Sequence, residues 1–159
     1  MRLTDLEAVA AIELEALSPW GRRALEQELR QPKSLQFVAE DNDLGVISGW
    51  CCGRLIGPEA ELLKISVLRS RRRYGIASLL LARLVQEVVA AGGQSLYLEV
   101  RAENAPAVLF YRKHGFKRTG LRKKYYTDPE DDAVVFVKDL LFNGLNNAFR
   151  QGGNHEINS

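Results

Sequence analysis

The chain has 159 residues, of which 46% are hydrophobic and 26% are charged, and its formal net charge is +2. This length and balance are typical of one globular domain with a buried core. The small net charge does not favour wholesale nucleic-acid binding, and no apolar run reaches the roughly 18 residues of a membrane span.

The cysteine and histidine content excludes a disulfide framework and a zinc site. Cys51 and Cys52 are adjacent, and neighbours in one strand point to opposite faces, so we expect no bridge between them. The two histidines, His114 and His155, come with no Cys-x-x-Cys pair. The segment after Met1 turns acidic where a signal peptide would turn apolar. We therefore expect a cytoplasmic, metal-free protein with reduced thiols.

The first half of the chain predicts two helices followed by three strands. Thr4 and Glu7 have the spacing of a capping box, and apolar residues at helical spacing predict a helix over 5–17. A second helix over 22–30 is expected to end before Pro32. Strands are predicted over 35–40, 44–55 and 62–68, with a turn at 41–43 that makes the first two a hairpin.

The second half alternates helices and strands. One helix is expected from Gly75 to Ala91. A second is expected to begin at Asn104, which would cap it, and to end at Gly115. Strands are expected over 96–101, from Phe116 onward and over 133–140. This order predicts an α/β fold in a single domain over 1–140, with a mixed central sheet and helices on both faces. The unit over 62–101 should be a right-handed parallel crossover. Residues 141–159 are polar, and we expect a tail that is loosely held or that contacts a neighbour.

The strongest functional signal is a basic segment between the third strand and the next helix. It contains four arginines, Arg69, Arg71, Arg72 and Arg73. Backbone N–H groups at a helix start lack partners and, with the helix dipole, form an anion site. Gly75 and Ala77 are small, so a phosphate can approach the backbone. The alternative is a solvated basic turn. A second group of five cations lies within 117–124.

Two further residues are candidates for acid–base chemistry. Glu99 lies in the strand over 96–101, where a carboxylate is costly unless it is paired or used, so it is a candidate general base. The alternative is a surface ion pair between Glu99 and Arg101. Tyr111 lies two helical turns after Asn104, and its hydroxyl can donate a proton. The alternative for Tyr111 is a core aromatic with a satisfied hydroxyl. His114 is expected to complement the helix dipole.

Taken in this order, these residues resemble the GNAT superfamily of acetyl-CoA-dependent N-acetyltransferases. The resemblance covers about residues 1–140. The residues that carry it are the strand Ile65-Ser66-Val67, the loop Arg72-x-x-Gly75-x-Ala77, the helix start at Asn104, and Tyr111 followed by Gly115-Phe116. It implies the GNAT fold and acetyl-CoA as the cosubstrate, with no metal.

A narrower resemblance is to the RimI-type ribosomal-protein-alanine N-acetyltransferases. The residues on which it rests are Pro19-Trp20, the stretch Leu98-Glu99-Val100-Arg101-x-x-Asn104, and Tyr125-Tyr126 before an acidic turn. These features imply that the acceptor is the N-terminal α-amine of a protein, such as a ribosomal protein. The resemblance implies no membrane partner and no direct nucleic-acid binding.

The resemblance also implies roles for individual residues. The cofactor site would comprise Ile65, Ser66, Val67, Arg72, Arg73, Tyr74, Gly75, Ile76, Ala77, Ser78, Asn104 and Tyr111. Glu99 would be the general base, with Glu103 as a rival, and Tyr111 the general acid. Trp20, Tyr125 and Tyr126 would contact the acceptor.

Two alternative functions stay open from the sequence alone. One is a GNAT acetyltransferase of a small amine, such as an amino acid, a polyamine or an antibiotic. The other is a non-catalytic module that binds acyl-CoA or RNA through its basic clusters.

Overall fold

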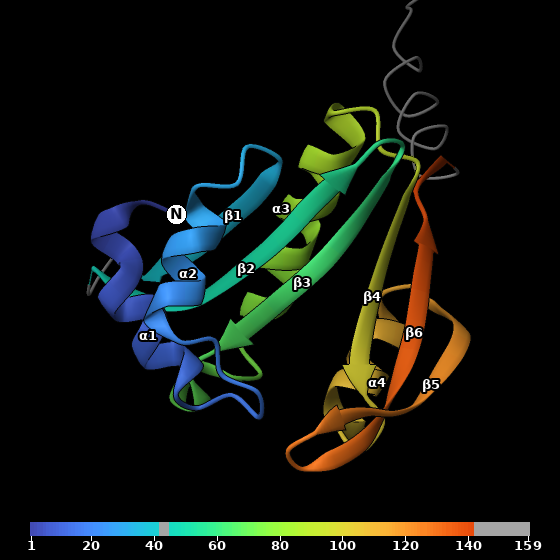
Figure 1. Ribbon diagram of the computed structural model, residues 1–159. Helices are drawn as coiled ribbons and strands as arrows, with labels where there is room; N and C mark the ends of the chain where they lie inside the picture. The colour runs from blue at the N-terminus through green and yellow to red at the C-terminus, as the bar shows by residue number, and fades with distance from the viewer. Residues whose placement is uncertain (42–44, 142–159) are drawn as a thin grey trace, which may run out of the picture.

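The computed structural model describes residues 1–41 and 45–141, which form a six-stranded mixed sheet in the order β1-β2-β3-β4-β6-β5 (Figure 1). The strands are β1 (Ser34–Asp41), β2 (Val46–Ile56), β3 (Glu59–Val67), β4 (Ser95–Arg101), β5 (Lys117–Thr127) and β6 (Glu130–Asp139). The helices are α1 (Leu6–Glu13), α2 (Arg22–Leu29), α3 (Ile76–Ala90) and α4 (Ala105–Lys113), with short 3-10 turns at Leu3–Asp5 and Arg69–Arg71. The predicted order of elements is confirmed over these residues.

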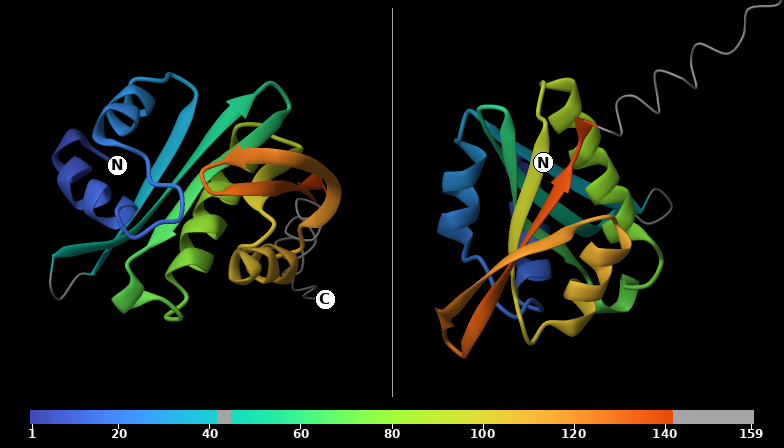
Figure 2. Two further views of the ribbon diagram at one scale, coloured as in Figure 1. Left: turned by 60° about the horizontal axis from the view of Figure 1, so that its bottom comes forward. Right: turned by 90° about the vertical axis from the view of Figure 1, so that its right-hand side faces the viewer.

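Helices cover both faces of the sheet, as predicted (Figure 2). Helices α1 and α2 pack on one face around Trp50, and α3 and α4 pack on the other around Leu84 and Phe136. Cys51 and Cys52 point to these two opposite cores and are both free thiols. Because burial dominates, the pKa of each thiol is raised to about 12. Neither cysteine is therefore a ready nucleophile.

Helix α3 lies close to the sheet because two glycines of β2 leave room for it. A Cβ at Gly53 would stand 2.8 Å from Leu84 Cδ1, and one at Gly49 would stand 3.0 Å from Ile76 Cγ2. Interiors are packed as densely as organic crystals, so even one added methyl group there would push the helix outward. These contacts place the first turn of α3 directly beside the end of β3.

Strands β3 and β4 pair only where they begin. The parallel register joins Glu59–Glu61 to Ser95–Tyr97 and goes no further, whereas β3 pairs with β2 along its whole length. Opposite Cys52 and Gly53 the register skips Leu63, so β3 carries a one-residue bulge there, and bulges bend strands. The two strands diverge toward their carboxyl ends in Figure 1. From Leu62 to Val67, the β4-facing edge of β3 has no strand partner among the described residues.

The first helix differs from its prediction at both ends. The capping box of Thr4 and Glu7 is wrong: the Asp5 carboxylate accepts the Arg2 backbone N–H at 2.6 Å, and a 3-10 turn precedes α1. Helix α1 ends at Glu13 rather than at residue 17. The cause is tertiary, because Glu13 is fully buried and accepts the Trp20 backbone N–H at 2.8 Å, which requires the chain to turn back.

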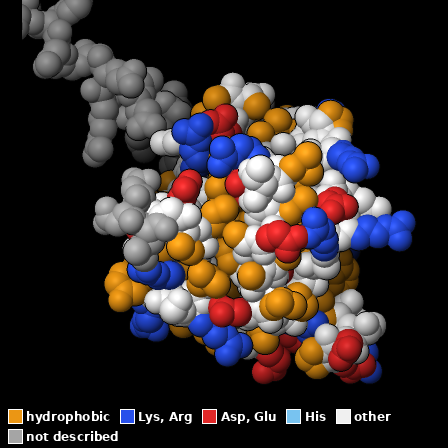
Figure 3. Space-filling model, turned by 90° about the vertical axis from the view of Figure 1, so that its left-hand side faces the viewer, with side chains coloured by type: hydrophobic (Ala, Val, Ile, Leu, Met, Phe, Trp, Pro, Cys, Tyr) orange, Lys and Arg blue, Asp and Glu red, His pale blue; other side chains and the backbone are white. Residues whose placement is uncertain are grey.

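The surface over α1, α2 and β1 carries hydrophobic, basic and acidic side chains side by side (Figure 3). This face therefore presents no continuous basic surface. Within the part of the chain that the structure describes, no helix combines the length and apolar character needed to cross a bilayer. The predicted turn at 41–43 and the tail fall mostly outside the described residues.

Candidate active site

Glu99 projects from β4 and is held by residues of β5. Its Oε1 lies 2.7 Å from Nε of Arg122, and its side chain is 15% exposed. A hydrogen bond between Tyr125 and Glu99 is the largest cause of a raised pKa at Tyr125. The alternative of a Glu99–Arg101 pair is wrong, because Arg101 binds other groups. Glu99 is thus a partly buried carboxylate in a polar setting, as a general base requires.

Tyr111 lies on α4 and is buried among aromatic rings. It is 7% exposed and makes tilted or edge contacts with Phe110, Phe116 and Phe136. Burial raises the pKa of its phenol well above the ordinary value. Its hydroxyl has no hydrogen-bond partner among residues 1–41 and 45–141. The ring therefore serves the core, but the proton of the hydroxyl remains available to a bound molecule.

Tyr126 connects the two candidate catalytic groups electrostatically. Burial raises the pKa of Tyr126, and the charge of Glu99 raises it further. Tyr126 in turn contributes, after burial and Cys51, to the raised pKa of Tyr111. Its ring meets that of Tyr125 edge-on at 5.2 Å between centroids. The structure thus brings Glu99, Tyr125 and Tyr126 together, with Tyr111 within electrostatic range.

The loop before α3 combines open space with an unusual backbone. Gly75 is the N-cap with φ +80°, and Arg73 has φ +68°, both in the left-handed region. No atom lies within 4 Å of the Cβ position of Gly75, so the glycine is needed for its φ and leaves the approach to the backbone clear. The first-turn N–H groups of Ile76, Ala77 and Ser78 have no intrahelical acceptor. Tyr74 is 76% exposed at the same place.

At the carboxyl end of β3, the backbone N–H and C=O of Val67 point toward the unpaired edge. Leu68 donates its backbone N–H to Ser48 O on β2 at 3.0 Å. The N–H and C=O of one strand residue point to the same side, and successive residues alternate between the two sides, so both groups of Val67 point away from β2. The C=O accepts Nε of Arg72 at 3.1 Å. Of the neighbouring candidates, Ile65 is half-buried, and Ser66 donates its hydroxyl to Glu13 at 2.8 Å.

The GNAT resemblance implies that acetyl-CoA binds at this loop, so a bulky side chain at Gly75 is expected to weaken that binding. Valine there would be strained at a positive φ and would project into the open approach, so Gly75→Val should raise the KM for acetyl-CoA about tenfold. Gly57, in the β2–β3 turn, has φ +63° and the same empty surroundings. Gly57→Val therefore carries similar strain and should leave this KM unchanged; a rise in both variants would reject the assignment. Steady-state kinetics with varied acetyl-CoA measure both.

Asn104 and His114 mark the two ends of α4. The Asn104 side chain accepts the Ala107 N–H at 3.3 Å, which confirms the predicted cap. His114 lies at the C-terminus as expected, but its ring also bridges to α3. Its Nδ1 lies 2.8 Å from Phe110 O, and its Nε2 lies 2.9 Å from Ser78 Oγ. The Ser78 side chain is thus engaged by α4, which leaves its backbone N–H as the group open to a ligand.

Glu13 is a fully buried polar residue for which the sequence predicted no role. One oxygen accepts Trp50 Nε1 at 2.9 Å and the Ser66 hydroxyl, and the other accepts the Trp20 N–H and lies 3.1 Å from Lys64 Nζ. Four donors satisfy a fully buried carboxylate. A signal was present, because Glu13 continues the apolar face of Leu6 and Val9 at helical spacing. Trp20, packed edge-on at 5.8 Å against Trp50, is held in place by this carboxylate.

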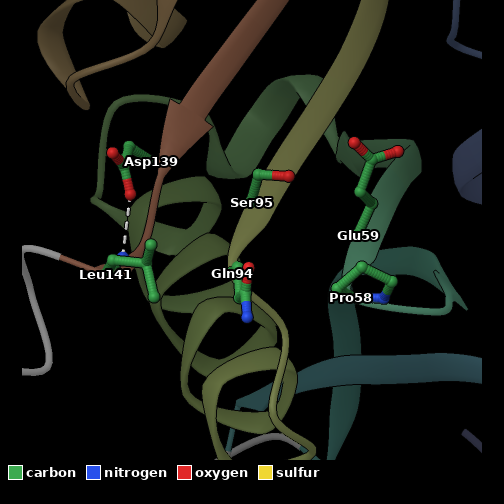
Figure 4. A pocket seen from close by; sticks show the side chains of 6 residues that line it. All are labelled: Pro58, Glu59, Gln94, Ser95, Asp139 and Leu141. Atoms are coloured by element: carbon green, nitrogen blue, oxygen red, sulfur yellow. Dashed lines mark hydrogen bonds between the residues drawn. The ribbon is translucent and has the colours of Figure 1, made fainter.

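The hollow shown in Figure 4 does not coincide with these residues. A shallow depression of about 240 Å³ is lined by Pro58, Glu59, Gln94, Ser95, Asp139 and Leu141 (Figure 4). It lies where β3 and β4 begin, at the opposite end of the sheet from Glu99. Among the described residues, no group of three or more histidine, cysteine or acidic side chains is arranged to hold a metal ion.

These features agree with a known family of enzymes. The chain belongs to the acetyltransferase (GNAT) family, whose sequence profile matches residues 5–116. The protein is therefore an enzyme that transfers acetyl groups.

Particular members of the family are similar over most of the chain. The [ribosomal protein bS18]-alanine N-acetyltransferase of Escherichia coli K12 is 32% identical over 140 residues, which cover 86% of this chain and 93% of that protein. The N-alpha-acetyltransferase RimI of Mycobacterium tuberculosis is 34% identical, with coverage of 86% and 89%. The crystal structure of the Escherichia coli ribosomal-protein-S18-alanine N-acetyltransferase superposes with a TM-score of 0.80 at 31% identity, with coverage of 88% and 90%.

Proposed function

We propose that this enzyme transfers an acetyl group from acetyl-CoA to the N-terminal α-amine of a protein, with a ribosomal protein that begins with alanine as the first candidate. The observation that carries the proposal is Glu99, held beside Tyr125 and Tyr126 at the end of β4, next to the edge where β3 loses its partner. The relatives named for acetylation of ribosomal-protein alanine support the choice of acceptor.

The donor would lie along the free edge of β3 and the start of α3. The pantetheine arm would extend the sheet beside Ile65–Val67, where backbone groups lack a strand partner. The thioester carbonyl would accept the N–H of Val67, which points away from β2. The pyrophosphate would lie on the N–H groups of residues 73–78, with charge supplied by Arg72 and Arg73. Asn104 would act by fixing the start of α4 through its cap.

The reaction needs a neutral amine as the nucleophile. A terminal α-amine has a pKa of about 7.7–8.0, so much of it is protonated near neutral pH. The amine nitrogen attacks the thioester carbon as its proton passes to Glu99, directly or through water. The C–N bond forms, the C–S bond breaks, and the Tyr111 hydroxyl protonates the departing thiolate. The apolar surroundings that raise the pKa of Tyr111 keep its phenol protonated until the thiolate forms.

A direct assay tests this acceptor class. The enzyme is incubated with acetyl-CoA and a peptide that begins with Ala, and tandem mass spectrometry locates the acetyl group. The matched control is the same peptide with a blocked N-terminus and a free internal Lys. Transfer to the free α-amine alone supports the proposal. Much faster turnover of amino acids, polyamines or antibiotics would replace it with the small-amine function, and absence of transfer to any amine would refute it.

The remaining assignments follow from this function. We assign the acetyltransferase domain to residues 1–140 and treat 141–159 as a polar tail, most of which lies outside the described residues. Acetyl-CoA and a protein N-terminus are the partners. We propose a cytoplasmic location, which a ribosomal acceptor and the two free cysteines would support.

A further inference from the structure

Arg101 is a buried cation that the proposed reaction does not use. It is 8% exposed and lies on the same face of β4 as Glu99, two residues further along. Each of the three guanidinium nitrogens makes a hydrogen bond. Nε donates to Ser18 Oγ at 3.0 Å, Nη1 to Pro129 O at 2.8 Å and Nη2 to Asp128 O at 2.9 Å. Cζ stands 4.2 Å from the centre of the Tyr126 ring.

These partners belong to two segments that are far apart in the sequence. Ser18 lies between α1 and α2, two residues before Trp20. Asp128 and Pro129 form the turn that joins β5 to β6, and Asp128 is two residues after Tyr126. The two segments lie side by side beyond the ends of β3 and β4 in Figure 1, and again in Figure 2. One side chain thus joins the two segments that carry the proposed acceptor residues.

The segment between α1 and α2 is also held from its other side. Ser18 O accepts Lys64 Nζ at 2.6 Å, and Lys64 pairs with Glu13 at 3.1 Å. Glu13 in turn binds the Trp20 N–H. The loop is therefore anchored to β3 through Lys64 and to the β5–β6 turn through Arg101. The first anchor involves α1, β2 and β3, whereas Arg101 links the loop to the β5–β6 hairpin.

We propose that Arg101 is a positioning residue for the acceptor, which it serves by clamping the β5–β6 turn to the loop that carries Trp20. The inference rests on the proposed function, because it assigns Trp20 and Tyr126 to the acceptor. The clamp fixes the separation of these two side chains beside Glu99, so an incoming N-terminus meets a preformed site. The planar guanidinium matters, because its donors point in fixed directions that one ammonium group cannot reproduce.

Replacement of Arg101 by Lys tests the clamp and keeps the charge. Lysine can satisfy only part of the three-fold contact, so we expect Arg101→Lys to raise the KM for an N-terminal Ala peptide about tenfold or more. The KM for acetyl-CoA should stay within about twofold, because no side-chain hydrogen bond of Arg101 reaches β3, α3 or α4. The matched control is Arg83→Lys, since Arg83 pairs with Glu87 on the outer side of α3. The control should change neither constant.

A purely structural role for Arg101 makes a different prediction. General destabilisation would lower the thermal midpoint and raise both KM values together, and that result overturns the proposal. Ser18→Ala provides a milder variant, because it removes one hydrogen bond and keeps the guanidinium. It should raise the peptide KM by about threefold and add little in the Arg101→Lys background, since both changes break the same contact. Full additivity of the two effects contradicts a shared clamp.

Hydrogen exchange separates this inference from the proposed function. In Arg101→Lys, backbone amides of 125–132 and 18–21 should exchange faster than in the wild type, while those of α3 should not. Unchanged exchange in both segments overturns the clamp, even if the wild type acetylates peptides. If the wild type acetylates only small amines, the proposed function fails. The faster exchange, with a raised KM for the amine, would then still support the clamp.

Discussion

Replacement of Tyr111 by Phe is expected to lower kcat by about a hundredfold or more, the usual contribution of a positioned acid. The change removes only the hydroxyl, whose proton is the one we assign to the thiolate. The ring contacts with Phe116 and Phe136 remain, so the midpoint of thermal unfolding should not change. The KM for acetyl-CoA should change little, because the hydroxyl is assigned to the transition state. Steady-state kinetics with saturating peptide measure the effect.

The control for Tyr111→Phe is Tyr97→Phe. Tyr97 lies on β4 with its hydroxyl 3.4 Å from Glu61, away from the assigned acid. Its loss should leave kcat within about twofold. A kcat for Tyr111→Phe that matches this control would show that the acid role is wrong.

The pH dependence of kcat is a second test of Tyr111 as the general acid. Burial raises its pKa, so the phenol stays protonated, and competent as an acid, at every pH below its ordinary value of about 10. The acid form would be lost only as the pH rises through the elevated pKa. We therefore expect no alkaline fall in kcat below pH 10. A fall near pH 8–9 that is absent in Tyr111→Phe would contradict this.

Replacement of Glu99 by Gln is expected to lower kcat/KM for the peptide by about ten- to a hundredfold at pH 7. The substitution keeps the shape of the side chain and removes the base. The loss should shrink toward pH 9, because the α-amine, with a pKa of about 7.7–8.0, then arrives already deprotonated. Measurement of kcat/KM from pH 6 to 9 in both forms tests the role.

Two controls make the result for Glu99 specific. The ion pair with Arg122 is also lost, but Arg122 is 60% exposed, and such pairs contribute little to stability. The thermal midpoint should therefore hold. Glu103→Gln tests the rival base, which is exposed on the loop after β4. A pH-dependent loss in Glu103→Gln with wild-type behaviour in Glu99→Gln would transfer the role to Glu103.

Most of the fold was predictable because its signals are local. Apolar spacing placed α2, α3 and α4 to within a few residues, and Asn104 marked the start of α4 as a cap. The glycine before α3 was also identifiable, and the structure shows that its positive φ requires it. The main errors, at the start and end of α1, arose where distant groups compete with local rules. Asp5, rather than Thr4, caps the first turn, and the Trp20 N–H draws the chain back at Glu13.

The sequence by itself determined the fold class, the candidate anion loop and the identity of the candidate base and acid, because each depends on residue type and short spacing. Only the tertiary structure decided their partners. Arg122 rather than Arg101 pairs with Glu99, and Arg101 instead binds Ser18, 83 residues away. Such contacts depend on how the sheet brings loops together, notably on where β3 and β4 part, and no local period in the sequence records that geometry.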